Sequence, residues 1–261
     1  MHSRILTLAT ACGAALLAPA ALPAADARPS DIQAQATTTV ASVSAETSVP
    51  SRLSRLSRPS RHSQRKREVR AAELLAAVRG CRQISHGRYR TDEGAPASIP
   101  VCAQHGAVHW KADLDVDCDG RAGRHCNRRT DPVYQHATAH QQSDGRQLSA
   151  ERLPYVVVPG ASRIWSPARS GIRGGTVAAL VHRNKVLYAV VGDSGPSGLI
   201  GEASYAAARG LGIDPDPVRG GAAGEVTYIL FPGATARPIE SHRAAAEAGR
   251  TAARKLLRRA D

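Results

Sequence analysis

The sequence predicts a mainly β protein with few helices, folded as one compact domain within a longer chain. Short runs of apolar and β-branched residues recur through the middle of the chain, each about the length of a strand. Gly-, Pro- and Asn-containing pairs separate these runs, as turns separate strands. With 261 residues and 42% hydrophobic composition, the chain has enough apolar material for a core of ordinary domain size.

Four segments carry the strand pattern, and two others are predicted to be helical. The strands are expected at residues 155–158, 176–181, 186–191 and 226–231. A helix is expected over Ala203–Leu211, ended by Gly212. The Ala- and Arg-rich segment Ile239–Arg259 has no proline and favours a second helix. Because its strongly apolar residues are few, we expect this second helix to be a solvated tail.

Composition divides the chain into four parts. A short apolar run, preceded by Arg4 and followed by small residues, is typical of an export signal, which we place at residues 1–27. Residues 28–70 are rich in Ser, Thr, Ala and Pro and are predicted to be a disordered basic linker. Residues 71–236 form the predicted folded domain, and residues 237–261 the basic helical tail. We therefore expect a secreted, extracellular protein whose mature chain has no membrane span.

The basic residues are concentrated at the two ends of the chain. There are 35 Lys and Arg against 22 Asp and Glu, a formal net charge of +13. Residues 1–70 carry +6 and residues 237–261 carry +4, which leaves only +3 for residues 71–236. The ends are either arms that contact an anionic cell-wall polymer or solvated tethers. An aromatic content of 3% argues against single-stranded nucleic-acid binding, which uses aromatic stacking.

Four cysteines remain once the export signal is removed. An even number of cysteines in an exported chain is typical of disulfides, and four cysteines allow three pairings. We favour Cys81 with Cys102 and Cys118 with Cys126, because each of these bridges is local in the sequence.

The first of two acidic motifs is a run of alternating aspartates. Residues 113–120 read Asp-Leu-Asp-Val-Asp-Cys-Asp-Gly, and alternation places Asp113, Asp115 and Asp117 on one face of a strand. A row of like charges favours a cationic neighbour, which could be a metal, arginines or a positively charged substrate. The run also matches the opening of a calcium-binding loop, although the twelfth position of that loop is Cys126 rather than Glu.

The second acidic motif lies in a glycine-rich segment that follows an apolar strand. Asp193 belongs to Gly-Asp-Ser-Gly-Pro at residues 192–196, and Glu202 lies nine residues later, at the expected start of a helix. Two carboxylates on adjoining turns are the arrangement that glycosidases use. Each residue is also ordinary at its position, because Asp is common in turns and Glu at helix N-termini.

The histidines and aromatic residues are weaker candidates. His136 and His140 have the i, i+4 spacing of a helical metal pair, but no third ligand is placed near them. We therefore predict no resident metal and no cofactor. Trp110, Trp165 and the six tyrosines could stack on sugar rings, although large aromatics usually lie in the core.

Taken in order, these motifs resemble the chitosanases of glycoside hydrolase family 75. The resemblance covers about residues 78–235, so the linker and the final helix fall outside it. It rests on residues 115–120 with Cys126, 153–159, 188–196, 200–204 and 226–233. Its most specific part is the pair of motifs Gly-Asp-Ser-Gly-Pro and Gly-Glu-Ala-Ser. By analogy with other polysaccharide-cleaving enzymes, the domain is expected to be a compact six-stranded, double-psi-like barrel.

The resemblance implies a secreted, endo-acting enzyme that hydrolyses the β-1,4 bonds of chitosan with inversion. It implies that Asp193 and Glu202 are the catalytic carboxylates, and we assign Glu202 as the acid and Asp193 as the base. Because chitosan is a cationic polymer of glucosamine, a cleft that binds it should carry carboxylates. The candidates for contacts with the substrate are Asp113, Asp115, Asp117, Asp119, Tyr188 and Ser204.

Two other functions are compatible with the residues. One is a non-catalytic secreted module that binds the cell wall or calcium. The other is an enzyme that cleaves the glycan strands of peptidoglycan. We expect the protein to be a monomer whose main partner is chitosan.

Overall fold

The computed structural model describes residues 68–261, which belong to one compact unit of the chain, Pro59–Asp261. The predicted export signal and all but the last three residues of the predicted linker lie outside the described residues. Within residues 68–261, no helix has the length and apolar character needed to cross a membrane.

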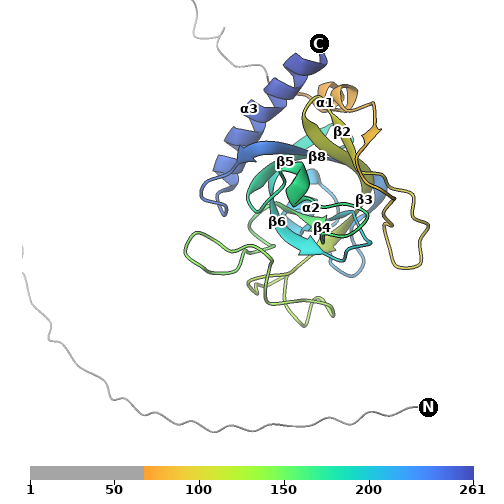
Figure 1. Ribbon diagram of the computed structural model, residues 1–261. Helices are drawn as coiled ribbons and strands as arrows, with labels where there is room; N and C mark the ends of the chain where they lie inside the picture. The colour runs from red at the N-terminus through yellow and green to blue at the C-terminus, as the bar shows by residue number, and fades with distance from the viewer. Residues whose placement is uncertain (1–67) are drawn as a thin grey trace, which may run out of the picture. The chain divides into compact units, whose positions relative to one another are not determined.

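Six strands close into a barrel. In order around the ring they are β3 (Ala107–Asp117), β7 (Glu202–Ser204), β4 (Tyr155–Pro159), β6 (Lys185–Gly195), β5 (Thr176–His182) and β8 (Ala222–Thr235). Pairing of β3 with β8 completes the ring, and Figure 1 shows the strands arranged around α2. Two short strands, β2 (Cys102–Gln104) and β1 (Arg82–Gln83), extend the sheet beyond β3. The expected mainly β, six-stranded barrel is confirmed.

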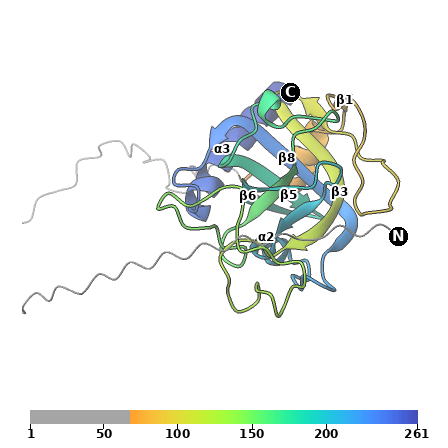
Figure 2. The same cartoon turned by 60° about the horizontal axis from the view of Figure 1, so that its bottom comes forward.

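The barrel combines parallel and antiparallel pairs. β3 pairs with β7, and β4 with β6, in parallel, whereas the other pairs around the ring are antiparallel. Parallel neighbours cannot be joined by a tight hairpin, so the chain needs long connections between them. A long irregular connection also joins β3 to β4, which are not neighbours in the ring, and Figure 2 shows it as the yellow-green segment that stands out from one side of the barrel.

Alternating side chains of the barrel strands form two cores. All six strands contribute to the first core, which therefore fills the interior of the ring; its largest members include Trp110, Leu180 and Tyr228. The ring of Trp110 stacks on that of Tyr228, with 5.3 Å between their centroids. The second core lies on the outer face, where α1 (Ala71–Ala77) and α3 (His242–Ala260) cover the strands.

The helix that follows the Gly-Glu-Ala-Ser motif is shorter than predicted. Residues 202–204 form β7, and α2 begins at Tyr205 and ends at Leu211. The Ser204 hydroxyl accepts a hydrogen bond from the Ala207 N–H and caps the helix, which is the common role of serine at this position. Glu202 therefore lies on a barrel strand rather than on a helix.

The expectation of a solvated C-terminal tail is wrong. α3 is helical as predicted, but its residues Ala245, Gly249, Ala253 and Leu256 are buried against the barrel. Three of these residues are small, so the helix backbone comes close to the sheet. A Cβ atom on Gly249 would lie 2.3 Å from Cδ1 of Tyr188. Alanine and glycine contribute little to a hydrophobic pattern in the sequence, although they pack against the sheet as closely as large side chains do.

Candidate active site

A β-bulge sets the direction in which Asp193 points. Val156 of β4 pairs with Val191 of β6, but the next residue, Val157, pairs with Asp193, so Gly192 is an extra residue on β6. Val156 and Val191 both lie in the inner core. Because of the bulge, Asp193 shares the outer face with Val157; strict alternation would have turned it inward with Val191. A Cβ at position 192 would lie 2.6 Å from the Tyr155 Cβ, so glycine is required there.

Glu202 reaches the same outer face from β7. Ala203 pairs with Val156 in antiparallel register, so Glu202 is level with Val157. Only β4 lies between β7 and β6, and two inter-strand spacings put the backbones of Glu202 and Asp193 roughly 10 Å apart. Gly201, with φ +129°, makes the turn that leads into β7, a conformation that glycine adopts without strain.

β3 adds further carboxylates to this row. Asp115 pairs with Glu202, and Asp117 pairs with Ser204. Leu114 belongs to the inner core, so the alternating residues Asp113, Asp115 and Asp117 face outward, as the sequence pattern predicted.

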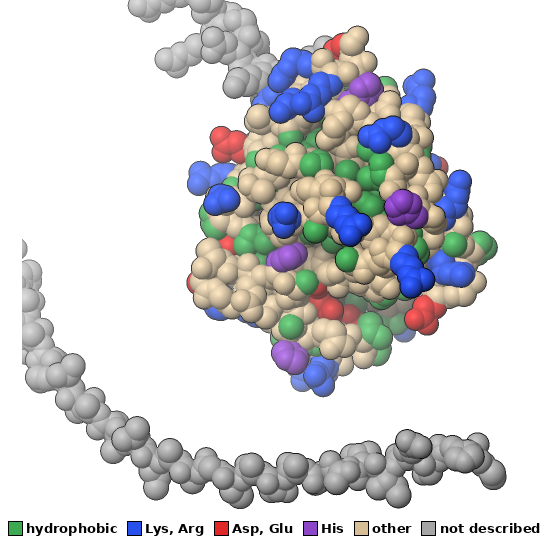
Figure 3. Space-filling model, in the orientation of Figure 1, with side chains coloured by type: hydrophobic (Ala, Val, Ile, Leu, Met, Phe, Trp, Pro, Cys, Tyr) green, Lys and Arg blue, Asp and Glu red, His purple; other side chains and the backbone are tan. Residues whose placement is uncertain are grey.

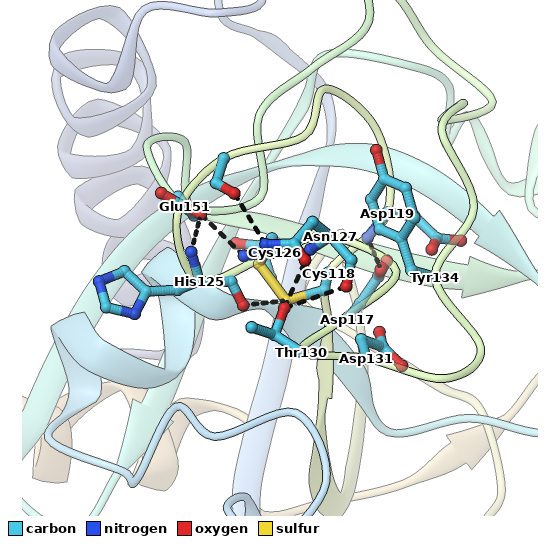
Figure 4. Close-up of a disulfide and its surroundings, with 12 residues drawn as sticks. Asp117, Cys118, Asp119, His125, Cys126, Asn127, Thr130, Asp131, Tyr134 and Glu151 are labelled. Carbon is cyan, nitrogen blue, oxygen red and sulfur yellow. Dashed lines mark hydrogen bonds between the residues drawn. A yellow bond between two sulfur atoms is a disulfide. The ribbon is translucent and has the colours of Figure 1, made fainter.

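A disulfide holds the loop that follows β3 beside the site, as Figure 4 shows. Both predicted bridges, Cys118–Cys126 and Cys81–Cys102, are confirmed. The Glu151 carboxylate accepts hydrogen bonds from the backbone N–H groups of His125 and Cys126, at 2.7 Å for the latter. The disulfide and these hydrogen bonds together hold the irregular loop close to β3.

The same disulfide rules out the calcium-loop interpretation. Cys126, at the position where that loop needs a bidentate glutamate, is bonded to Cys118. Asp115 and Asp117 belong to strand β3 rather than to a loop between two helices. The match to the loop opening in the sequence arose from strand alternation.

Five carboxylates line one cavity of about 280 Å³ on the outer face: Asp117, Asp119, Asp131, Asp193 and Glu202. One oxygen atom from each of Asp117, Asp119 and Asp193 lies within 4.8 Å of the others. Among the described residues, none of the five forms an ion pair with Lys or Arg. Figure 3 shows Lys and Arg side chains spread over one face of the molecule, with acidic side chains in only a few places. Negative charge is thus concentrated in this cavity, whereas the charged side chains on the face shown in Figure 3 are mainly basic.

Burial and mutual repulsion raise the pKa of three carboxyl groups in the cavity, those of Glu202, Asp119 and Asp117. Burial, followed by the charges of Asp115, Asp119 and Asp193, raises the pKa of Glu202 to about 7. The pKa of Asp119 rises to about 6, mainly because of burial. The pKa of Asp117 is raised well above its ordinary value for the same reason. Several of these groups can therefore hold a proton near neutral pH.

Asp193 has surroundings that favour its charged form more strongly. Burial raises its pKa, but its Oδ1 accepts hydrogen bonds from the N–H groups of Ala139 and Ser194, each at 2.7 Å. The nearby His140 also lowers the pKa of Asp193. Hydrogen bonds to a carboxylate stabilise its ionised state. The site thus combines a carboxyl group with a strongly raised pKa and a carboxylate held by backbone donors.

Comparison with known proteins supports a hydrolase site in this fold. The family model for "Fungal chitosanase of glycosyl hydrolase group 75" matches residues 114–258, more than half of the chain. The chain belongs to this family. The match includes α3, so the expectation that the final helix lies outside the family region is wrong.

The curated relatives of this family 75 protein are fungal. "Endo-chitosanase C" of Aspergillus oryzae is 29% identical over 172 residues, covering 62% of this chain and 43% of the relative. An "Endo-chitosanase" of the same species is 30% identical over 142 residues, covering 50% of this chain and 58% of the relative. The chain thus spans about half the length of the curated relatives it matches.

Two of the predicted sugar contacts in this family 75 domain are wrong. Ser204 has 0% exposure; its hydroxyl donates to the Leu153 carbonyl and accepts from the Tyr155 N–H, besides capping α2. Tyr188 is buried in the outer core beneath α3, where burial raises its pKa to about 12. Neither side chain is available to a ligand.

Sequence reasoning also missed residues of the cavity. Asp131 and Val133 line it from the irregular connection between β3 and β4. The backbone N–H of Ala139 binds Asp193 from the same connection. No periodicity marks such positions, because their placement depends on the disulfide and on long-range hydrogen bonds. The only signal for Asp131, Val133 and Ala139 was the run of alternating acids that precedes them, because it indicated which strand the following connection would cover.

Proposed function

We propose that the protein is a secreted endo-chitosanase that hydrolyses β-1,4-glycosidic bonds of chitosan by a two-carboxylate inverting mechanism. One observation carries this proposal: Glu202 and Asp193 lie level with each other on either side of β4, on the walls of one acidic cavity. Inverting glycosidases hold their carboxyl groups about 6.5–9.5 Å apart, which leaves room for a water molecule. The backbones of Glu202 and Asp193 are separated by one intervening strand, β4, so their side chains can meet that requirement.

Glu202 is the proposed acid and Asp193 the proposed base. With its pKa near 7, Glu202 carries a proton at mildly acidic pH and donates it to the leaving oxygen. Asp193, whose Oδ1 accepts hydrogen bonds from two backbone N–H groups, accepts a proton from the attacking water. The water then adds to the anomeric carbon as the glycosidic bond breaks, and the configuration inverts.

The charge of the site supports a cationic substrate. Asp115, Asp117 and Asp119 provide carboxylates beside the proposed catalytic pair, without Lys or Arg partners among the described residues. Ammonium groups of glucosamine units offset this charge, whereas acetylated units do not. Family membership and the names of the relatives support the same substrate. The two disulfides support export to an oxidising compartment.

The decisive experiment measures the release of reducing ends from chitosan, chitin and peptidoglycan in parallel. We expect release from chitosan, and a rapid fall in viscosity before much sugar is released, as endo cleavage requires. Proton NMR of fresh products should show the α anomer first if the reaction inverts. Release from peptidoglycan alone would favour a wall-cleaving enzyme, and no release from any polymer would favour a binding module.

A further inference from the structure

A second group of carboxylates lies beside the cavity, on the far side of Glu202 from Asp193. One oxygen atom from each of Asp92, Asp113 and Asp115 lies within 4.8 Å of the others. Asp115 is the register partner of Glu202, so this group is continuous with the proposed catalytic row. We propose that these three aspartates bind the ammonium group of one glucosamine unit and so require a deacetylated sugar at that position.

Asp113 provides the main observation for a ligand. Its side chain is buried, with 6% exposure, and its Oδ1 has no hydrogen-bond partner among the described residues. A buried carboxylate oxygen without a donor is unfavourable, because it has lost water and gained nothing in return. Asp115 and Asp92 are exposed, so the group has a buried floor and an open rim. An ammonium group entering from solvent would supply the missing donor.

The loop that carries Asp92 is fixed to the segment that leads into Glu202. The Arg90 N–H donates to the Gly198 carbonyl at 3.1 Å, and the Ile200 N–H donates to the Arg90 carbonyl at 3.0 Å. The Thr91 hydroxyl donates to the Asp92 carboxylate at 2.9 Å. The position of Asp92 beside β3 therefore follows from backbone contacts.

The charge of this group is not offset by an ion pair with any Lys or Arg that the structure describes. Burial, followed by the charges of Asp115, Asp92 and Glu202, raises the pKa of Asp113 to about 7. Only acids contribute to that charge effect, so the described part of the chain supplies no positive charge that lowers the pKa of Asp113.

The number of acceptors fits an ammonium group. An –NH₃⁺ group has three donors, and three carboxylates face one another here. Calcium takes six to eight oxygen ligands, so it would need all three carboxylates to bind through both oxygens or further ligands from carbonyl groups or water. An acetylated amine is neutral and bulkier, so it would leave the carboxylates uncompensated and desolvated. The ammonium site rests on the proposed function above, because it presumes a glucosamine polymer in the cavity.

The test compares Asp92→Asn with Glu93→Gln, a neighbouring exposed carboxylate outside the group. Wild-type protein and both variants digest partially acetylated chitosan, and the terminal sugars of the products are identified by mass spectrometry. We expect wild type and Glu93→Gln to leave only glucosamine at one of the two new ends. For Asp92→Asn we expect acetylated sugars at that end and a kcat/KM on fully deacetylated chitosan about tenfold lower.

Calorimetric titration with a glucosamine hexamer and with its fully acetylated analogue keeps this test separate from catalysis. Asp92→Asn should weaken binding of the glucosamine hexamer about tenfold and leave binding of the acetylated analogue unchanged. If the wild-type protein is inactive on chitosan but binds the glucosamine hexamer more tightly than Asp92→Asn does, the proposed hydrolase function is refuted and the ammonium site is supported. Equal behaviour of Asp92→Asn and Glu93→Gln in both assays would overturn the ammonium site. Calcium binding that is lost in Asp92→Asn, with no change in glucosamine binding, would also overturn it.

Discussion

Asp115 on β3 and Glu202 on β7 are register partners in a parallel strand pair, which puts an exposed carboxylate directly beside a partly buried one. After burial, Asp115 is the largest cause of the raised pKa of Glu202. Two neighbouring like charges disfavour simultaneous ionisation, so the more buried group keeps its proton. A strand register thus tunes the group that we propose as the acid.

Removal of either proposed catalytic carboxylate should abolish most of the activity. We expect kcat on chitosan to fall by about 100- to 10,000-fold in Asp193→Asn and in Glu202→Gln, because each loses one half of the proton transfer. Initial rates of reducing-end release provide the measurement. Glu225→Gln, an exposed carboxylate outside the cavity, is the matched control and should retain full activity. Near-normal turnover in both catalytic variants would refute the assignment.

The pH dependence of kcat should reveal the influence of Asp115 on Glu202. Under the proposed mechanism, activity needs a protonated Glu202, so it should fall as the pH rises through about 7. Asp115→Asn removes a negative neighbour and lowers the pKa of Glu202, so the falling limb should move to lower pH. A soluble glucosamine hexamer is used as the substrate. Its amino groups titrate in the same way in both assays, so they do not contribute to the difference between wild type and variant. An unmoved or upward-shifted limb would contradict this electrostatic role.

Asp113 should make the protein less stable at higher pH. Its pKa of about 7 in the folded state lies above the ordinary value of 3.8, so the folded protein holds a proton that the unfolded chain has lost between these values. Stability contributed by this group is therefore lost as the pH rises from about 4 to 7. We expect Asp113→Asn to have a melting temperature a few degrees above that of wild type at pH 8.

The same comparison at pH 4 provides the control for Asp113→Asn. At pH 4, close to the ordinary pKa of 3.8, the folded chain holds this proton and the unfolded chain still holds about half of it, so most of the advantage of the variant should vanish. An equal difference at both pH values would mean that charge is not the cause.

The two disulfides should differ in what their loss affects. Cys118 and Cys126 are separated by 8 residues, and Cys81 and Cys102 by 21, so each bridge should contribute about 3 kcal/mol to the free energy of unfolding. Replacing Cys118 and Cys126 with alanine frees the loop of Asp119 and should also lower kcat at least tenfold. The matched Cys81 and Cys102 variant should lose stability with little change in kcat, as measured by denaturant titration and initial rates.

Close packing of α3 should make position 249 intolerant even of alanine. Gly249→Ala gains up to about 1 kcal/mol of helix propensity, but its methyl group meets the ring of Tyr188 and overpacking costs about 1–3 kcal/mol. We expect a net loss of about 1–2 kcal/mol in the free energy of unfolding, measured with urea. The exposed Thr251→Ala on the same helix should show no such loss. A stabilised Gly249→Ala would mean that α3 is loosely docked.

Much of the strand framework was readable from the sequence, because apolar runs and alternation report local structure. The alternation of Asp113, Asp115 and Asp117 was correct for this reason, and so were the local disulfides. The docking of α3 was not readable, because alanines and a glycine pack through shape rather than hydrophobicity. The loop contacts of Asp193 also escaped, because they join residues 54 positions apart.

The single extra residue at Gly192 has a consequence for how this enzyme family can vary. Deleting it would restore strict alternation to β6 with Asp193 still opposite Val157 on the outer face, but it would remove the local twist that a bulge gives a strand and so change the direction of the carboxylate. Keeping Gly192 but losing the bulge would instead turn Asp193 into the hydrophobic interior. The chemistry therefore depends on a count of backbone units as much as on side-chain identity, and a homologue that keeps both acids but alters that count should fold poorly or lack activity.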